Sequence, residues 1–402
     1  MMVTETSWES SKLDELGFVG RGKSRHRRRD AAFLHGGQYP FFQSGDIKAA
    51  SLYLRDHTQT YSEAGLAQSK LWNPGILYIT IAANIAETAI LGVEGCFPDS
   101  VVGFIPDPEK AEVRFIKYYI DTIKLQMQSV SRGTTQDNLN VDKLLSFDFR
   151  VPSVYEQRRI ASILSAYDEL IENCQRRIRI LEDMARALYR EWFVHFRFPG
   201  REMTSRVTSA LCDIPKDWEM KKLMHVAEVN RAQINARSAP EELHYIDISS
   251  VSPGQIDSVT TYAFSDAPGR ARRIVQHGDM LWSCVRPNRR SHTQVMHPEA
   301  NTIASTGFAV LTVTKVPFTF LYFATTTDDF VAYLTNNATG AAYPAVTAAT
   351  FEKADLLIPP TPLLKQFGDA TIPMAEQIHT LQRQLQNLCR TRDVLLPQLL
   401  SP

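Results

Sequence analysis

The sequence predicts an α+β protein: two α/β units joined by two long, antiparallel coiled-coil helices, with an internal pseudo-twofold repeat. Three observations support this fold class. Similar segments recur about 200 residues apart, each half closes on a matched heptad pattern, and a linker containing proline, glycine and serine separates the halves. The expected order is an α/β unit at 1–152, a helix at 153–198, a linker at 199–209, an α/β unit at 210–358 and a helix at 359–402.

Composition limits the protein class. The 402 residues include 44 basic and 44 acidic side chains, so affinity for a polyanion must come from local clusters. The five cysteines are widely spaced without a C-x-x-C pair, which argues against a disulfide framework or a zinc site and fits a reducing compartment. The apolar stretch 75–91 is too short and too polar to span a membrane. We therefore expect a soluble, cytoplasmic protein without a membrane partner.

The first unit resembles the second. "PGILYIT" (74–80) matches "HGDMLWS" (277–283) at a separation of 203 residues. Three later pairs lie 207 residues apart: Gly133 and Gly340, Asp148 and Asp355, Pro152 and Pro359. Each half therefore ends a strand at its proline and then enters a helical pattern.

The first helix carries an apolar seam whose steps alternate between four and three residues, which is a coiled-coil heptad pattern. Its positions are Ile160, Leu164, Tyr167, Ile171, Cys174, Ile178, Leu181, Ala185, Leu188 and Trp192. Such a stripe can also bury itself in the core of its own unit. Two matched seams favour pairing of the helices with each other.

The second seam keeps the same register 207 residues later. Its positions are Phe367, Thr371, Met374, Ile378, Leu381, Leu385, Leu388, Arg392 and Leu395. Thr371 and Arg392 are the polar exceptions, and Pro373 predicts a helix start or a kink.

Binding is favoured over catalysis. The chain has no phosphate-binding loop of the G-x-x-x-x-G-K-[ST] type and no G-x-G-x-x-G turn. It also lacks the Asn/Asp-Pro-Pro-aromatic motif of amino-methyltransferases, and its ten histidines show no spacing that indicates a metal. We therefore expect no catalytic residue and no metal in this chain.

These features together resemble the specificity subunit of a type I restriction–modification system, over essentially the whole chain. The segments that carry the resemblance are "GRGKSRHRRR" (20–29), "PFFQSGDIK" (40–48), "TYSEAGLAQSKLW" (60–72), "ITIAANIAETAIL" (79–91), "FPDSVVGF" (97–104), "EQRRIASILSAYDELIENCQRRIRILEDMARALYREWFV" (156–194) and "RDVLLPQLLS" (392–401).

The resemblance implies a non-catalytic, DNA-binding subunit of a phage-defence system. Two target-recognition domains would each read one half of a bipartite site in double-stranded DNA, separated by the two helices. Two methyltransferase subunits, which use S-adenosylmethionine to methylate adenine, and two restriction subunits, which use ATP and Mg²⁺, would assemble on it. The chain itself would hold no cofactor. Lys365-Gln366 only partly matches the family's Glu-Gln opening of the second helix, which puts the second methyltransferase contact in doubt.

The basic run 21–29 fits a role in phosphate contact. A run like this can be a solvated loop, a targeting address or a phosphate-binding segment. Its place in the resembled pattern favours DNA contact through Lys23, Ser24, Arg25, His26 and Arg27. Ser44 and Lys70 could border the surface formed by the loop 79–84 of the first unit.

The second unit has its own basic cluster at 269–292. Asp279 in it is expected to be structural. Arg286 and Asn288 suit base edges, because Arg pairs with guanine and Asn with adenine in the major groove, although a phosphate role is nearly as plausible. The other predicted DNA-binding residues are Ser283, Arg289, Arg290 and Tyr343 in the second unit, and Thr80, Asn84 and Gln136 in the first.

Two other functions stay open on the sequence. One is a self-contained restriction or methylation enzyme with a fused recognition region, which the missing motifs disfavour. The other is a coiled-coil adaptor that does not bind DNA, which the two basic clusters disfavour.

Overall fold

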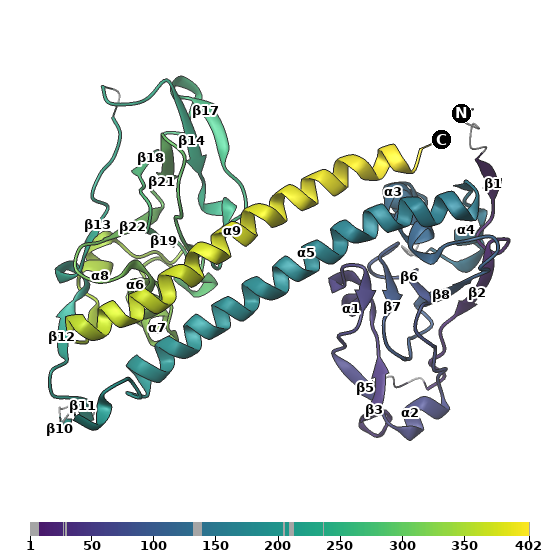
Figure 1. Cartoon of the computed structure of the whole chain (residues 1–402), viewed down its shortest axis with the longest axis horizontal. Coiled ribbons are helices and arrows are strands. Elements are labelled where there is room, and N and C mark those ends of the chain that lie inside the picture. Colours follow the sequence, from purple (N-terminus) through teal and green to yellow (C-terminus); the bar gives the residue numbers. More distant parts are fainter. Residues whose placement is uncertain are drawn as a thin grey trace. The chain divides into compact units, whose positions relative to one another are not determined.

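The computed structural model describes residues 8–26, 28, 30–131, 139–203, 206–208, 213–235 and 237–401. The chain divides into two compact units: residues 1–176 with 383–402 (unit 1), and residues 177–382 (unit 2). Two long helices, α5 (Val154–Tyr189) and α9 (Thr361–Leu399), each contribute one part to either unit. Figure 1 shows them in teal and yellow. Within the described ranges, no helix is long and apolar enough to cross a bilayer.

Unit 1 is built on a five-stranded sheet of order β2-β8-β6-β7-β4, with β6 at its centre. Its strands are β1 (Glu9–Ser11), β2 (Gly17–Arg21), β3 (His35–Phe41), β4 (Tyr53–Leu54), β5 (Gln59–Tyr61), β6 (Leu77–Thr80), β7 (Thr88–Leu91), β8 (Val101–Pro106) and β9 (Phe149–Val151). Its shorter helices are α1 (Ser44–Ala49), α2 (Glu63–Ala67), α3 (Val113–Ser131) and α4 (Val141–Ser146).

The central strand β6 is buried on both faces, which explains its continuous apolar sequence. Successive side chains of a strand point to opposite faces. Leu77 and Ile79 accordingly join a core that contains α3 and the start of α5. Tyr78 points to the other face, where it packs with Phe97 in a second core.

Unit 2 contains a four-stranded sheet of order β13-β22-β19-β20 and a second one of order β17-β14-β21-β18. Its strands are β10 (Arg206–Thr208), β11 (Asp213–Pro215), β12 (Glu219–Lys222), β13 (Ala227–Val229), β14 (Glu242–Ile246), β15 (Val251–Ser252), β16 (Gln255–Ile256), β17 (Thr260–Ala263), β18 (Ala271–Ile274), β19 (Met280–Ser283), β20 (His292–Gln294), β21 (Thr302–Ser305), β22 (Phe308–Val313) and β23 (Asp355–Ile358). Its shorter helices are α6 (Phe318–Thr325), α7 (Asp328–Asn336) and α8 (Ala348–Glu352).

Strand register confirms the predicted repeat. Leu77 of β6 pairs with Phe104 of β8, and Met280 of β19 pairs with Leu311 of β22. The first members of these pairs lie 203 residues apart (280 minus 77) and the second members 207 (311 minus 104). The same two separations appeared in the sequence, so the two units share this sheet framework.

The predicted heptad seams are also confirmed. Every position of the first seam is buried or half-buried in α5 or the turn that follows it, and every position of the second is buried or half-buried in α9. One detail was wrong: Pro373 does not start a helix, because α9 begins at Thr361 and continues through that proline.

Within each unit, the start of one long helix packs with the end of the other. In unit 1, Leu395 and Leu399 of α9 pack on the core that contains Ile160 of α5. In unit 2, Leu188 of α5 and Trp192, in the π-helical turn Arg190–Val194 that follows it, pack on the core that contains Phe367 of α9. The two helices are therefore paired antiparallel, as the seams predicted.

Candidate nucleic-acid interface

The exposed loop of unit 2 begins where β19 ends. Ser283 is buried, and its hydroxyl bonds the carbonyl and amide of Val285 at 3.0 and 3.3 Å, which starts a tight turn. Arg286 and Arg290 adopt left-handed backbone conformations (φ 51° and 56°) on either side of the 3-10 turn Pro287–Arg289. Asn288 in that turn is exposed, as is Arg289. The loop thus presents an amide and a guanidinium outward.

A second loop supports the first. The Arg286 guanidinium lies 4.6 Å from the centre of the Tyr343 ring and donates to the Ala342 carbonyl at 3.2 Å. The Arg286 amide donates to the Pro344 carbonyl at 2.7 Å. Tyr343 itself is 68% exposed. We call residues 284–291 and 337–345 the loop pair; it joins two segments that the sequence had predicted separately.

The cations of the loop pair differ in their partners. Arg290 forms an ion pair with Asp328 at the start of α7, and this hydrogen bond lowers the pKa of the Asp328 carboxyl. In the described part of the chain, the Arg289 guanidinium has no acidic partner. Arg289 and Asn288 are therefore the groups most available to an incoming phosphate or base edge.

The basic segment of unit 1 follows β2. Gly22 is required there, because a Cβ at that position would lie 2.2 Å from the Pro98 carbonyl oxygen. Two hydrogen bonds hold the segment against the residues after α2: Ser69 Oγ donates to the Lys23 carbonyl at 2.9 Å, and the His26 amide donates to Gln68 Oε1 at 3.0 Å. Lys23 and Arg25 are exposed on this support.

Lys70 follows Ser69, whose hydroxyl holds the Lys23 carbonyl of this segment. Its ammonium lies 3.6 Å from the centre of the Trp72 ring and 5.7 Å from that of Phe18. The indole face positions the charge without neutralising it. Lys70 and Lys23 therefore belong to one supported basic surface, which we call the basic segment surface.

Three of the predicted contact residues have buried hydroxyls. Thr80 is fully buried; its hydroxyl donates to the Asn84 carbonyl and accepts from the Glu87 amide at 3.0 Å, so it closes a turn. Ser283 does the same in unit 2. The Ser24 hydroxyl is buried, without a partner among the described residues. All three hydroxyls face inward in this structure, and DNA contact by these residues stays a prediction.

The remaining predicted residues stay predictions. Asn84 is half-buried and Ser44, also half-buried, opens α1, which packs against β6 and β7. The His26 ring bonds the Arg28 carbonyl at 3.0 Å and lies edge-on to Phe33. Arg27 and Gln136 lie outside the described residues.

Asp279 is structural in the way the sequence predicted. The residue is 2% exposed, and its carboxylate accepts from the Gln276 amide at 2.9 Å and the Thr312 hydroxyl at 2.7 Å. Burial raises the pKa of Asp279 to about 6. The side chain holds the turn that leads into β19.

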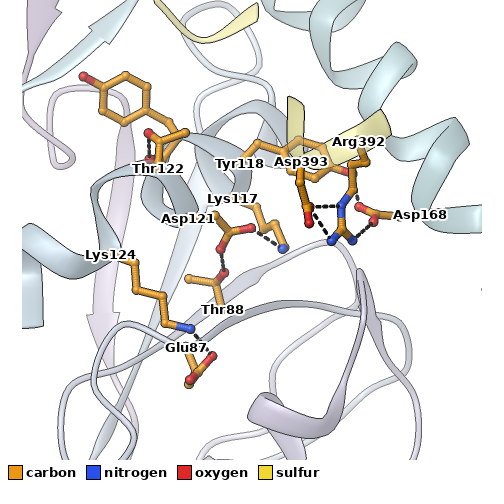
Figure 2. A network of polar contacts seen from close by, with 11 residues as sticks. Glu87, Thr88, Lys117, Tyr118, Asp121, Thr122, Lys124, Asp168, Arg392 and Asp393 are labelled. Carbon is orange, nitrogen blue, oxygen red and sulfur yellow. Dashed lines mark hydrogen bonds and ion pairs between the residues drawn. The ribbon is translucent and has the colours of Figure 1, made fainter. Parts of the chain in front are cut away.

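A polar pocket of about 270 Å³ lies in unit 1 (Figure 2). Lys117 pairs with Asp121 at 2.5 Å, Lys124 with Glu87 at 2.7 Å, and Arg392 with Asp168 at 2.7 Å. Since each of these cations already faces a carboxylate, the pocket is a poor phosphate site. The ion pair with Asp168 also explains why the second seam has a polar residue at Arg392, because its charge has a buried partner on α5.

Sequence reasoning missed one cluster in unit 2. The cluster consists of His277, His297 and Glu376. His277 lies 20 residues before His297 in the chain, and Glu376 lies 79 residues after it. Histidine spacing in the sequence could not indicate this cluster, because its members come from distant segments. One signal for a metal-ligand group was present in the sequence: Glu376 and His379 are three residues apart, a spacing that places both on one helix face.

Comparison with known proteins agrees with the fold. A family model described as the type I restriction modification DNA specificity domain matches residues 5–182. The MjaIX specificity subunit of Methanocaldococcus jannaschii, a type I restriction enzyme subunit, is 23% identical over 98% of this chain and 92% of its own length. The HindI specificity subunit of Haemophilus influenzae, also of type I, is 21% identical over 69% of this chain and 73% of its length.

A solved structure shares the fold. The S subunit of a type I restriction–modification system from M. genitalium superposes with a TM-score of 0.67 at 15% identity, covering 100% of this chain and 98% of that chain. The resemblance stated from the sequence is thus confirmed by a family model over residues 5–182 and by a relative that aligns over 98% of this chain. Residues 5–182 thus match the type I restriction modification DNA specificity domain, and the chain as a whole is similar to specificity subunits of type I restriction enzymes.

Proposed function

We propose that each unit of this chain reads one half of a bipartite site in double-stranded DNA, and that the chain carries no catalytic activity of its own. The observation that carries the proposal is the repeated sheet framework, in which β6 and β19 pair with β8 and β22 in equivalent registers and each end at a hydroxyl that closes a turn. Because each unit contains one copy of this sheet framework, each unit can bind one half of a bipartite site.

The loop pair is the proposed base-reading surface of unit 2. Asn288 and Arg289 are exposed at the tip of a turn whose backbone is fixed by Arg286. A preorganised loop loses little conformational entropy on binding. Arg and Asn also have the donor and acceptor geometry that discriminates base pairs in the major groove.

The basic segment surface is the proposed phosphate contact of unit 1. Lys23, Arg25 and Lys70 are exposed cations on a backbone held by hydrogen bonds and an indole ring. Because the net charge of the chain is zero, this local charge must supply the attraction to DNA.

We further propose that methyltransferase subunits, two per chain, and restriction subunits bind this chain and supply the S-adenosylmethionine, ATP and Mg²⁺ chemistry. α5 offers apolar side chains outside its seam: in unit 1, Tyr155 is 78% exposed and Leu170 is 53% exposed. Ile163 between them is 38% exposed, and the spacing of eight and seven residues places all three on one face of α5. A continuous apolar face of this kind is typical of a protein–protein contact. The cellular compartment that fits this assembly is the cytoplasm.

Methylome sequencing tests the proposal. A host that carries the chain with its methyltransferase should gain methylated adenines in one bipartite motif, and a host with the methyltransferase alone should not. Methylation that does not require the chain would contradict the proposal. Incubating the chain alone with DNA and labelled S-adenosylmethionine tests the rival enzyme, and a gel shift across salt concentrations tests the rival adaptor.

A further inference from the structure

Two imidazoles and a carboxylate converge at one end of the β19–β20 hairpin in unit 2. His277 precedes β19 and His297 follows β20, so both lie at the open end of the hairpin. Glu376 comes from α9. Its carboxylate lies 2.7 Å from His297 Nε2 and 3.6 Å from His277 Nε2, and the three ligand atoms lie within 4.8 Å of one another.

The backbone holds these groups in place. Gly278 donates to the Val295 carbonyl at 2.8 Å, which brings the two hairpin ends together. His297 has a φ of 45°, in the left-handed region that non-glycine residues seldom adopt. Such a conformation persists where its surroundings fix it, and it is found at sites with a function.

The donor set fits a transition metal. Two histidines and one glutamate with an open position form a known type of zinc site. Zinc–ligand bonds of about 2.1 Å place tetrahedral ligands about 3.4 Å apart, so the 2.7 and 3.6 Å separations need only small side-chain rotations. Imidazole nitrogen suits Zn²⁺ and its neighbours and not Ca²⁺ or Mg²⁺.

A fourth donor lies one helical turn further along. His379 follows Glu376 by three residues on α9, and its ring centre lies 5.5 Å from that of His297. Residues three apart share a helix face. His379 can therefore approach the same ion from the side of the helix.

Metal binding requires one exchange of hydrogen bonds. The His297 amide donates to His277 Nδ1 at 3.2 Å. Binding through Nε2 would place the ring proton on Nδ1, which then no longer accepts. Both residues are exposed, so water replaces this bond at little cost.

The repeat offers an internal comparison. The positions of unit 1 that correspond to His277, Glu376 and His379 are Pro74 (277 minus 203), Glu169 (376 minus 207) and Glu172 (379 minus 207). Glu172 there forms an ion pair with Arg55. The histidine cluster is therefore absent from those positions, and the shared framework does not require it.

We propose that His277, His297 and Glu376, with His379 as the fourth ligand, bind a divalent transition metal of the Zn²⁺ class that ties α9 to the open end of the β19–β20 hairpin. The closed end of the same hairpin carries loop 284–291. The metal therefore fixes the hairpin to α9 within unit 2. This site does not depend on the proposed function, since its ligands lie outside the loop pair.

Zinc and cobalt titrations of the full chain, with any histidine tag removed and after EDTA treatment, test the proposal. We expect one Zn²⁺ per chain by mass spectrometry of the metal content, and a d–d absorption band with Co²⁺. At a hundredfold excess of Zn²⁺ over Kd, the melting temperature should rise by roughly 5 °C. His297→Ala and Glu376→Gln should each weaken binding at least ~10-fold.

His244→Ala is the matched control. His244 faces Glu299 at 3.5 Å in the same unit, without a third ligand in the described structure, so this variant should bind Zn²⁺ like the wild type. The proposal is overturned if the wild type retains less than about half an equivalent of Zn²⁺, or if Glu376→Gln, with unchanged circular dichroism, binds as tightly as the wild type. In either case the cluster is an ordinary histidine–glutamate ion pair.

Discussion

Arg392 of α9 donates a 2.7 Å hydrogen bond to Asp168 of α5 in unit 1, and Asp168 is only 3% exposed. Tyr118 also donates to this carboxylate, at 2.5 Å (Figure 2). The ion pair raises the pKa of the Arg392 guanidinium, although burial opposes that shift more strongly than any single favourable contact. A buried carboxylate thus joins the end of α9 to the start of α5.

Removing one partner should destabilise unit 1 strongly. Arg392→Ala leaves Asp168 buried without its cation, which costs about 3–5 kcal/mol of unfolding free energy. Replacing the whole group (Asp168→Leu, Arg392→Leu, Tyr118→Phe) should restore most of that loss, because no buried polar group is left unpaired. Urea denaturation measures both.

Lys365→Ala provides the control for this change. Lys365 and Asp369 form an exposed i,i+4 pair on α9, so the change should cost less than about 1 kcal/mol. If Arg392→Ala and Lys365→Ala lost the same unfolding free energy, the buried Arg392–Asp168 pair would contribute no more than an exposed ion pair.

Loss of this ion pair should weaken self-association of half-chains, because a half-chain contains Asp168 but not Arg392. A fragment of residues 1–200 contains α5, which can pair with a second copy of itself. In that dimer Asp168 would face Ala185, the counterpart of Arg392 (392 minus 207). We expect the fragment to dimerise, and Ala185→Arg to tighten the dimer at least ~10-fold, since it supplies the missing guanidinium.

Sedimentation of four fragments measures this coupling: wild type, Ala185→Arg, Asp168→Asn and the double variant. The gain from Ala185→Arg should disappear in the Asp168→Asn background. A gain that persists there would mean that the introduced guanidinium acts without Asp168.

Asn288→Ala tests base reading by the loop pair. Discrimination should fall by roughly 1–3 kcal/mol at one position of one half-site, because an amide pairs with a single base edge. Binding-site selection with the assembled complex measures it, and the other half-site is the internal control. Uniform weakening of both half-sites would identify a backbone contact.

Arg25→Ala tests phosphate contact by the basic segment surface. Affinity should fall for all sequences alike, and the slope of log K against log salt should flatten by about one, as expected for one lost phosphate contact. Filter binding across salt concentrations measures the slope. An unchanged slope would make Arg25 a solvated surface residue.

Asp279 should make stability depend on pH. Its folded pKa of about 6 lies above the ordinary value of 3.8, so the folded protein binds more protons between these values. The contribution of Asp279 to stability should therefore be greatest below about pH 4 and fall by up to about 3 kcal/mol as the pH rises through the folded pKa.

Asp279→Asn removes that loss. The amide can still accept from the Gln276 amide and donate to the Thr312 hydroxyl, so the variant should be more stable than the wild type at about pH 8 and equal to it near about pH 4. Urea denaturation at both pH values measures it. A variant that is less stable at the higher pH would contradict the raised pKa.

The sequence alone determined the repeat, the two seams and the resemblance to type I specificity subunits. The repeat can be read from the sequence because equivalent residues keep a fixed separation: the values 203 and 207 recur in the strand register. The seams can be read because heptad spacing predicts which side chains of α5 and α9 are buried. Asp279 was predicted as structural for a similar reason, because it stands beside the Gly278 turn.

Tertiary structure alone decided which polar residues face outward and which charges are paired. Thr80 and Ser283 occupy loop positions in sequence, but their hydroxyls close turns inside the fold. The Asp168–Arg392 pair joins segments 224 residues apart (392 minus 168). The histidine cluster joins segments up to 99 residues apart (376 minus 277). No periodic pattern encodes such contacts, because they depend on which elements fold against each other.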